Sequence, residues 1–574
     1  MDRTAVAPSR EGRSPEEQNT GTAGSKGSVA APSGDASGAR GTGPVEYLSG
    51  RWLRVAQVGL VVVVAAGLLL RFWTRSALWL DEALTVNISR LPLHEIPSYL
   101  KRDGAPPLYY VLLHFWMKVF GTSDLGVRSL SGVLSVATLP VAWVAGRRFG
   151  GRPVAWVLLA LLASAPFAVY YGTEVRMYSL VMFGTACGFV ALGRVLERPR
   201  PGNMVALAVV VGALLYSQYW AIYLVGSLGL WLLWQAWRGR EAWRSSARWA
   251  ILAVVGGVVL FLPWVPTFVY QARYTGTPWA KPANFAAIIN AVTGFTDNQA
   301  TLTTAGSNQG RLLALGYFAL VALALFGVAR DHWHVDLDLR GRARTRGLTF
   351  VVICTLAVAI TGGIITGSAF SPRYAAVVFV PLLVLVAYGA FSLAHAGVRF
   401  AVVAVLVLAG LAGSVENVYT QRTQAPKVAA VLNAQAKPGD IVAYCPDQLG
   451  PAVYRLASAG QTGRTGGHGR LDMVTFPRGT GPAFVDWVNY KRAAESTSTA
   501  AFVSELQRLA GQDHAVWFVH EMGYQGFATK CTQIAGELAA LPGYGAHNWV
   551  AANPDSYYEP MDLTQFAPRA LPTR

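Results

Sequence analysis

The sequence predicts a polytopic α-helical membrane protein with a smaller α/β domain at its C-terminal end. Of the 574 residues, 53% are hydrophobic and only 14% are charged, which is too apolar for a water-soluble chain of this length. Apolar runs near the length that a bilayer requires recur from Val55 onward. After Ser414 the hydropathy falls, and the pattern changes to short apolar strands and amphipathic helices.

The first 50 residues are expected to form a disordered cytoplasmic tail. They are rich in Gly, Ser, Ala and Pro and contain almost no large apolar side chains, so burial cannot offset the entropy lost on ordering. No apolar core precedes Val55, so we expect no cleavable signal peptide.

The region 51–414 is expected to be the transmembrane domain. A bilayer core of about 30 Å requires about 20 mostly apolar residues per helix, and about eleven segments come near this length. These segments are 55–72, 127–145, 154–171, 179–196, 204–216, 220–237, 249–270, 312–329, 348–366, 374–394 and 398–414.

The links between these segments predict the orientation. Four links are rich in arginine and are therefore expected in the cytoplasm: 147–152, 197–202, 238–248 and 340–346. This places the N-terminus inside and residues 74–126 outside a plasma membrane, with its lipids as partners. The same links explain the net charge of +17, so we expect no nucleic-acid partner.

Two longer segments on the predicted outer side are not counted as spans. The stretch PPLYYVLLHFWMKVFG at 106–121 is interrupted by His114 and Lys118, and its crossing would place the basic links outside. We therefore expect a helix that lies along the outer interface. The loop 271–310 is the longest of the remaining outer loops and could act as a lid; it carries Trp279, Lys281 and Asp297.

Residues 415–574 are expected to form an extracytoplasmic α/β domain. GDIVAY at 439–444 and HAVWFV at 514–519 are typical of buried strands. TGPAFVDWVNYKRAA at 480–494 and AFVSELQRLAG at 501–511 are typical of amphipathic helices. Whether Cys445 and Cys531 form a disulfide in this domain is left open by the sequence.

Two adjacent acids stand in the apolar stretch LWLDEALTVN at 78–87, namely Asp81 and Glu82. Acids at this position can simply cap an interfacial helix. Other charges, however, lie on the same outer side, and because charges at the bilayer edge are costly, their gathering there indicates a polar site. Asp103 precedes the double proline of DGAPPLYY, and the charges at predicted outer ends of spans are Arg128, Glu174, Arg176 and Arg373.

Each of these residues also has a simpler explanation. A single interfacial arginine commonly extends its charged end into water from a helix end. Tyr178 and Tyr374 fit an aromatic belt at the membrane surface. HWH at 332–334 and GRTGGHGR at 463–470 are more typical of loops than of metal or phosphate sites, and neither a CxxC nor an HExxH motif is present.

Taken in order, five stretches resemble the GT-C membrane glycosyltransferases of the protein O-mannosyltransferase and lipid A aminoarabinose transferase superfamily (glycosyltransferase family 39). They are DEA at 81–83, DGAPPLYYVLLHFWMKVFG at 103–121, LGVRSLSGVLSV at 125–136, YYGTEVRMYSL at 170–180 and SPRYAAV at 371–377. The resemblance implies a GT-C fold and transfer of a sugar, such as mannose or a pentose, from a polyprenyl-phosphate donor. The acceptor would be a glycan, a lipid or a protein on the outer face.

The resemblance also implies roles for residues. Asp81 matches the acidic position of the family and is assigned as the base, with Glu82 as its orienter or as a metal partner. Candidate phosphate ligands are Arg128, Arg176 and Arg373, because arginine offers paired donors to a phosphate. The other substrate-binding candidates are Asp103, Glu174, Tyr178 and Tyr374. No cofactor is certain, and a divalent metal ion between acid and phosphate is left open.

Two other classes of protein remain as alternatives. A transporter or flippase of a lipid-linked saccharide would also need many spans and a few intramembrane charges, although the sequence has no convincing internal repeat. A non-catalytic assembly or sensor protein would act through its α/β domain. Under the enzyme hypothesis, this domain is expected to govern acceptor choice or stability rather than bond making.

Overall fold

The structure is a computed structural model that describes residues 45–276, 283–284, 286–296, 308–461, 471–479, 481–522, 527 and 529–568. Most of the expected N-terminal tail lies outside these residues. So do Trp279, Lys281 and Asp297 of the expected lid, and the stretch GRTGGHGR at 463–470.

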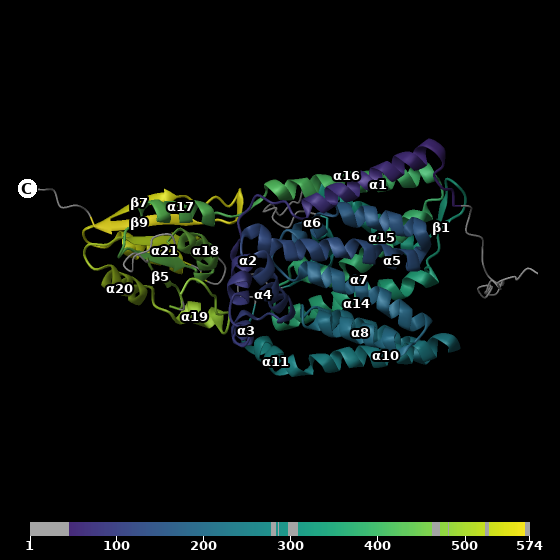
Figure 1. Cartoon of the computed structure of the whole chain (residues 1–574), viewed down its shortest axis with the longest axis horizontal. Coiled ribbons are helices and arrows are strands. Elements are labelled where there is room, and N and C mark those ends of the chain that lie inside the picture. Colours follow the sequence, from purple (N-terminus) through teal and green to yellow (C-terminus); the bar gives the residue numbers. More distant parts are fainter. Residues whose placement is uncertain are drawn as a thin grey trace, which may run out of the picture. The chain divides into compact units, whose positions relative to one another are not determined.

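Long apolar helices pack side by side in the first part of the chain (Figure 1). They are α1 (Gly50–Leu70), α5 (Asp124–Ser164), α7 (Tyr178–Glu197), α8 (Pro201–Leu215), α9 (Ala221–Arg238), α10 (Glu241–Phe261), α13 (Asn308–Phe326), α14 (Ala343–Thr366), α15 (Ala376–Gly389) and α16 (Ala396–Tyr419). Within the described residues, eight helical segments are long and apolar enough to span a membrane. The chain is therefore a multi-pass membrane protein.

The expected spans map onto these helices with two differences. The segments 127–145 and 154–171 lie largely within α5, which changes direction at Gly151, where φ is 84°. The segments 204–216 and 220–237 correspond to α8 and α9, which do not count among the eight candidate spans. The number of eleven crossings therefore stays a prediction.

Burial distinguishes the centre of the bundle from its surface. The segment Pro372–Ser392, which contains α15, has 89% of its apolar window buried, whereas α1 has only 17% buried. α15 packs against α5, α7 and α13. The turn Pro372–Ala375, which precedes this central helix and contains Arg373, is therefore held in a well-defined place.

Three short helices stand at one end of the bundle (Figure 1): α2 (Leu80–Ser89), α3 (Ile96–Asp103) and α4 (Leu108–Phe120). α4 has 13 residues, fewer than the about 20 that a crossing requires. It buries Tyr109, Leu113 and Met117 but exposes Phe115 and Val119. Its expected position along the outer interface is compatible with this pattern and stays a prediction.

The α/β domain contains a five-stranded sheet of order β5-β4-β6-β9-β7. Its strands are β4 (Ile441–Cys445), β5 (Asp472–Thr475), β6 (Val516–His520), β7 (Tyr544–Val550) and β9 (Asp562–Pro568). β4 pairs in parallel with β5 and β6, whereas β9 is antiparallel to β6 and β7. The strands expected at 439–444 and 514–519 are confirmed as β4 and β6, whose ten residues are all buried.

The helices of this domain are α17 (Ala425–Gln435), α18 (Gly450–Gln461), α19 (Tyr490–Ser496), α20 (Thr499–Ala510) and α21 (Lys530–Ala539). The expected helix at 501–511 is confirmed as α20. Cys445 and Cys531 form a disulfide with a Cα–Cα distance of 5.5 Å, which ties the end of β4 to α21.

The helix expected over 480–494 is wrong for residues 481–489, because α19 begins only at Tyr490. The backbone N–H of Trp487 donates instead to the carbonyl of Arg102, and the N–H of Asn489 donates to that of Tyr274. These N–H groups bond to the helical part of the chain and are therefore not available for hydrogen bonds within a helix.

A second, two-stranded parallel sheet joins the two parts of the chain. β3 (Gln421–Thr423) directly follows α16 and pairs with β8 (Tyr557–Glu559). The backbone N–H of Arg422 donates to Ser76 Oγ, at 2.8 Å, just before α2. β3 and β8 are thereby fixed next to the two acids of α2.

Candidate functional site

Asp81 and Glu82 occupy the first turn of α2, where the positive end of the helix dipole favours carboxylates. Neighbouring residues of a helix point in different directions, and here the two environments differ strongly. The side chain of Glu82 is completely buried, whereas that of Asp81 is 16% exposed. The two acids therefore have different tasks.

Glu82 is fully engaged by protein donors. Arg128 Nε donates to Oε1 at 2.8 Å, and Arg128 Nη2 donates to Oε2 at 2.6 Å. The backbone N–H of Val175 donates to Oε1 at 3.0 Å. Burial alone would raise the pKa of Glu82, but Arg128 and Arg422 outweigh it and hold the pKa below its usual value.

Arg128 lies near the start of α5, and its guanidinium is likewise held by hydrogen bonds to protein groups. Besides Glu82, it donates from Nη1 to the Ser76 carbonyl at 2.6 Å and from Nη2 to the Ala77 carbonyl at 3.0 Å. Its side chain is 6% exposed. Arg128 was expected to bind phosphate, but the structure places it inside the protein as the partner of Glu82.

Arg422 of β3 was missed by the sequence analysis. It donates to the Thr173 carbonyl at 3.0 Å and to Thr173 Oγ1 at 2.7 Å, and its Nη1 lies 3.5 Å from Glu82 Oε2. Its guanidinium also lies over the Tyr170 ring, 4.3 Å from the centroid. The only sequence signal was a basic residue a few positions after the last span, which resembles an ordinary arginine that extends its charged end into water.

Asp81 faces two arginines. Arg373 Nη1 donates to Asp81 Oδ2 at 3.0 Å, and Arg176 Nε lies 3.8 Å from the same oxygen. Arg373 belongs to the 3₁₀ turn Pro372–Ala375 before α15, and Arg176 lies between α6 (Pro166–Gly172) and α7. These three side chains are 12% to 16% exposed, so they are less enclosed than Glu82. The structure thus brings together three residues that the sequence analysis selected.

Asp103 joins this group through Tyr110. The Tyr110 hydroxyl donates to Asp103 Oδ2 at 2.8 Å, and Arg176 Nη1 donates to the Tyr110 oxygen at 3.3 Å and to Thr85 Oγ1 at 3.1 Å. Burial raises the pKa of Asp103 above its usual value, although Arg176 opposes this. Asp103 therefore helps to orient Arg176.

Glu174 is also close to these groups but is more enclosed. Trp79 Nε1 donates to Glu174 Oε1 at 3.1 Å, and Oε2 has no hydrogen-bond partner among the described residues. Burial raises the pKa of Glu174 to about 7, against the opposing effect of Arg422. Glu174 can therefore hold a proton near neutral pH.

Aromatic rings surround the Asp81 group. The Arg373 guanidinium lies 5.8 Å from the centroid of Trp79 and 5.6 Å from that of Tyr374. Tyr178 is fully buried and acts electrostatically on Arg373. Tyr558 of β8, which the sequence analysis missed, meets Trp79 edge to face with ring centroids 5.0 Å apart.

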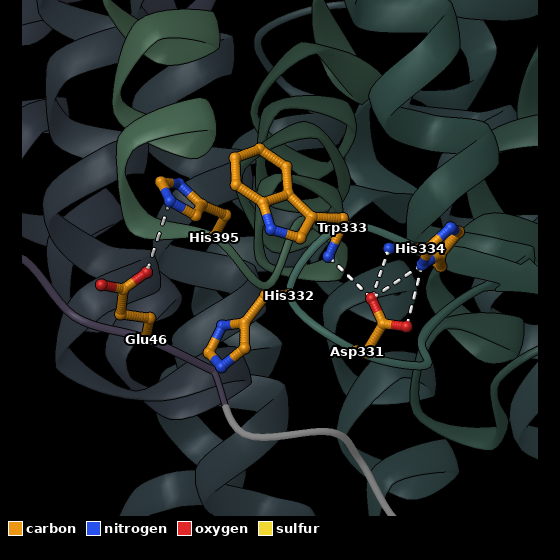
Figure 2. Close-up of a pocket in the computed structure, with 6 residues that line it drawn as sticks. All are labelled: Glu46, Asp331, His332, Trp333, His334 and His395. Atoms are coloured by element: carbon orange, nitrogen blue, oxygen red, sulfur yellow. Dashed lines mark hydrogen bonds and ion pairs between the residues drawn. The ribbon is translucent and has the colours of Figure 1, made fainter.

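A pocket lies at the end of the bundle that carries β1 (Gly327–Ala329) and β2 (Val335–Leu337), away from α2 (Figures 1 and 2). Its lining residues are Glu46, Asp331, His332, Trp333, His334 and His395. Asp331 accepts hydrogen bonds from the backbone N–H groups of Trp333 and His334, so it shapes the hairpin loop. We place the site at Asp81 rather than here, because only that group combines acids with arginines that can receive a phosphate.

The side chains around Asp81 and Glu82 bear on whether a metal ion could bind there. Within the described ranges, no three His, Cys, Asp or Glu side chains are arranged to hold a metal ion. Arg128 and Arg422 neutralise Glu82, and Arg373 and Arg176 accompany Asp81. The described residues therefore offer no metal centre built from protein side chains alone, and a metal ion held between Asp81 and a phosphate stays a prediction.

Sequence and structure comparisons relate this chain to known proteins. The family model described as dolichyl-phosphate-mannose-protein mannosyltransferase matches residues 104–266. That segment includes Arg128, Glu174 and Arg176. No curated protein matches the sequence.

Three solved structures are similar over most of the chain. ArnT from Cupriavidus metallidurans in the apo state has a TM-score of 0.54 and 14% identity, covering 90% of this chain and 97% of that one. Its structure bound to undecaprenyl phosphate gives 0.53 and 13%, covering 90% and 98%. AglB from Archaeoglobus fulgidus, in complex with an inhibitory peptide and a dolichol-phosphate, gives 0.51 and 11%, covering 92% and 75%. The expected GT-C fold is therefore confirmed.

Proposed function

We propose that this chain is a membrane glycosyltransferase of the GT-C type that moves a sugar from a polyprenyl-phosphate donor to an acceptor hydroxyl on the outer side of the membrane. The observation that carries this proposal is the contrast between the adjacent acids of α2. Glu82 is buried and fully engaged, whereas Asp81 is partly accessible and faces Arg373 and Arg176.

Asp81 acts as the base. It takes the proton of the acceptor hydroxyl while the hydroxyl oxygen attacks the anomeric carbon of the donor sugar. The bond between this carbon and the phosphate oxygen breaks, and the electron pair leaves with the polyprenyl phosphate.

Arg373 and Arg176 bind the phosphate. The departing group changes from a phosphodiester with one negative charge to a monoester with up to two, so fixed positive charge is worth more in the transition state than in the ground state. Aromatic rings hold the Arg373 guanidinium in place, and the Tyr110 hydroxyl holds that of Arg176. Little reorganisation is then needed when the charge develops.

Arg128, Arg422 and Glu82 have a positioning role. Their ion pairs fix the first turn of α2 against α5 and β3. Asp81 directly precedes Glu82 in this turn, so its carboxylate is held in place by the same contacts. The proposed steps are written with these side chains alone.

Two comparisons support the class of donor. The matched ArnT structure is bound to undecaprenyl phosphate and the matched AglB structure is in complex with a dolichol-phosphate, which are both polyprenyl phosphates. The description of the matched family names mannose. Mannose is therefore the first donor sugar to test, and a pentose is the second.

The test uses the full-length protein in lipid nanodiscs with radiolabelled polyprenyl-phosphate mannose or pentose. We expect release of free sugar to water, and transfer to a cell-envelope fraction that supplies acceptors. Proteoliposomes that move the intact lipid-linked sugar across the bilayer without cleaving it would instead support the flippase alternative. A protein that cleaves neither donor would contradict the proposal.

A further inference from the structure

The α/β domain contributes an aromatic side chain to the candidate site. β8 is held in register with β3, with Gln421 opposite Tyr557 and Thr423 opposite Glu559. This pairing fixes Tyr558 against Trp79, with the two rings at 88° and their centroids 5.0 Å apart. Trp79 in turn immediately precedes α2. The position of Tyr558 relative to Asp81 is therefore set by secondary structure on both sides.

Tyr558 lies among the reactive groups and yet remains accessible. Asp81, Arg373 and Glu174 all act electrostatically on its hydroxyl. Its surface is nevertheless 40% exposed, whereas Trp79 is 5% exposed and Glu174 is 1% exposed. Among these neighbours, Tyr558 is the ring that a ligand can reach.

The location of Tyr558 distinguishes the two substrates. The polyprenyl chain of a donor lies in the bilayer, and its phosphate is proposed to bind Arg373 in the 3₁₀ turn before α15. On that side Tyr374 packs near Trp220, at the start of α9, with ring centroids 5.9 Å apart. Tyr558 instead comes from the α/β domain, on the side from which an acceptor arrives.

We propose that Tyr558 is an acceptor-binding residue, whose ring stacks against a sugar ring of a saccharide acceptor and so presents an acceptor hydroxyl to Asp81. This inference rests on the proposed function. A sugar ring has an apolar face of C–H groups bordered by hydroxyls. It therefore fits an exposed aromatic ring that stands beside carboxylate and guanidinium groups.

The same strand offers a matched control. Side chains alternate along a strand, so Tyr557 points away from the face that carries Tyr558. Its ring contacts the Lys427 ammonium, 5.2 Å from the ring centroid, instead of Trp79. Tyr557→Ala removes a ring of the same kind from the same strand without touching the site.

The experiment divides the reaction into two readouts with one radiolabelled donor, the one that the wild-type protein cleaves. Release of free sugar to water reports on donor cleavage alone. Transfer of label to a cell-envelope fraction also requires the acceptor. Both are measured for the wild-type protein, Tyr558→Ala, Tyr558→Phe and Tyr557→Ala, with thermal unfolding as the folding control.

We expect Tyr558→Ala to raise the KM for the envelope acceptor by roughly 3- to 10-fold, the change that corresponds to one lost aromatic contact. The KM for the donor and the rate of hydrolysis should stay within about twofold, because phosphate binding and the base are unchanged. Tyr558→Phe should keep most of the transfer, because it keeps the ring. Tyr557→Ala should behave as the wild type.

Three results would overturn the inference. Equal losses of hydrolysis and transfer in Tyr558→Ala would show a structural role, and unchanged transfer would show no role. Label that protease treatment releases from the envelope fraction would mean a protein acceptor instead of a saccharide. By contrast, a wild-type protein that cleaves no donor would refute the proposed function itself, and the role of Tyr558 with it.

Discussion

Arg128 holds the Glu82 carboxylate with two hydrogen bonds, from Nε to Oε1 at 2.8 Å and from Nη2 to Oε2 at 2.6 Å. This relationship divides the work between two adjacent acids. Under the proposed function, it commits Glu82 to the structure of the site and leaves Asp81 as the base. It also changes the expected role of Arg128 from phosphate ligand to positioning residue.

Arg128→Ala should therefore destabilise the protein before it affects donor binding. Removing one partner of a buried ion pair leaves the other charge uncompensated, at a cost of about 3–5 kcal/mol. Adding Glu82→Gln should restore part of the loss, because the unpaired charge is then absent. Thermal unfolding of both variants in nanodiscs measures this. A stable Arg128→Ala protein with weakened donor binding would return Arg128 to the phosphate site.

Arg373→Ala should raise the KM for the donor and lower kcat, because a phosphate ligand acts in both the ground and the transition state. Arg373→Lys should keep part of the binding, since the charge remains but the paired donors of the guanidinium are lost. Arg148→Ala is the control, because Arg148 pairs with the exposed Glu197. Donor titrations that do not distinguish Arg373→Ala from this control would exclude Arg373 from the phosphate site.

The α/β domain should be required for donor cleavage as well as for acceptor binding. A chain that ends at Thr420 lacks Arg422, which lies 3.5 Å from Glu82 Oε2, and Tyr558. Both this truncation and Arg422→Ala in the full-length chain should lose most of the hydrolysis of the donor. This revises the sequence-based expectation that bond making would not depend on the domain. A folded truncated protein with wild-type hydrolysis would contradict the revision.

Asp447 should make the stability of the α/β domain depend on pH. It is buried and accepts a hydrogen bond from the Tyr490 hydroxyl, and burial raises its pKa from 3.8 to about 7. As pH rises through this window, the unfolded chain ionises while the folded protein keeps the proton, so stability falls. Asp447→Asn should therefore raise Tm more at pH 8 than at pH 5. The exposed Asp472→Asn is the control, and equal gains at both pH values would exclude this effect.

Hydropathy alone predicts much of the architecture, because each span and each buried strand is a local apolar pattern. The strands at 441–445 and 516–520 and the helix at 499–510 follow this rule. The segment 481–489 does not, because its backbone N–H groups bond to Arg102 and Tyr274 across the domain boundary. No local pattern carries that information.

Part of the candidate site could also be predicted from the sequence. Short motifs near span ends selected Asp81, Arg176 and Arg373, and the fold brings them together. Which of the two adjacent acids is turned inward depends on the ion pairs of Glu82 with Arg128 and Arg422, which local sequence does not express. Arg422 and Tyr558 lie far from α2 along the chain, and only the pairing of β3 with β8 places them at the site.

The most direct test of the proposed mechanism is the initial rate and donor affinity of purified Asp81→Asn. This variant keeps the size of the side chain but removes the proton acceptor, so turnover should fall by roughly 100- to 10,000-fold. Donor affinity should persist or increase, because Arg373 and Arg176 no longer share their charge with Asp81. The control is Glu95→Gln, a partly exposed acid that precedes α3. If Asp81 only caps α2, asparagine replaces it almost without loss, and a stable Asp81→Asn protein with near wild-type turnover would contradict its role as the base.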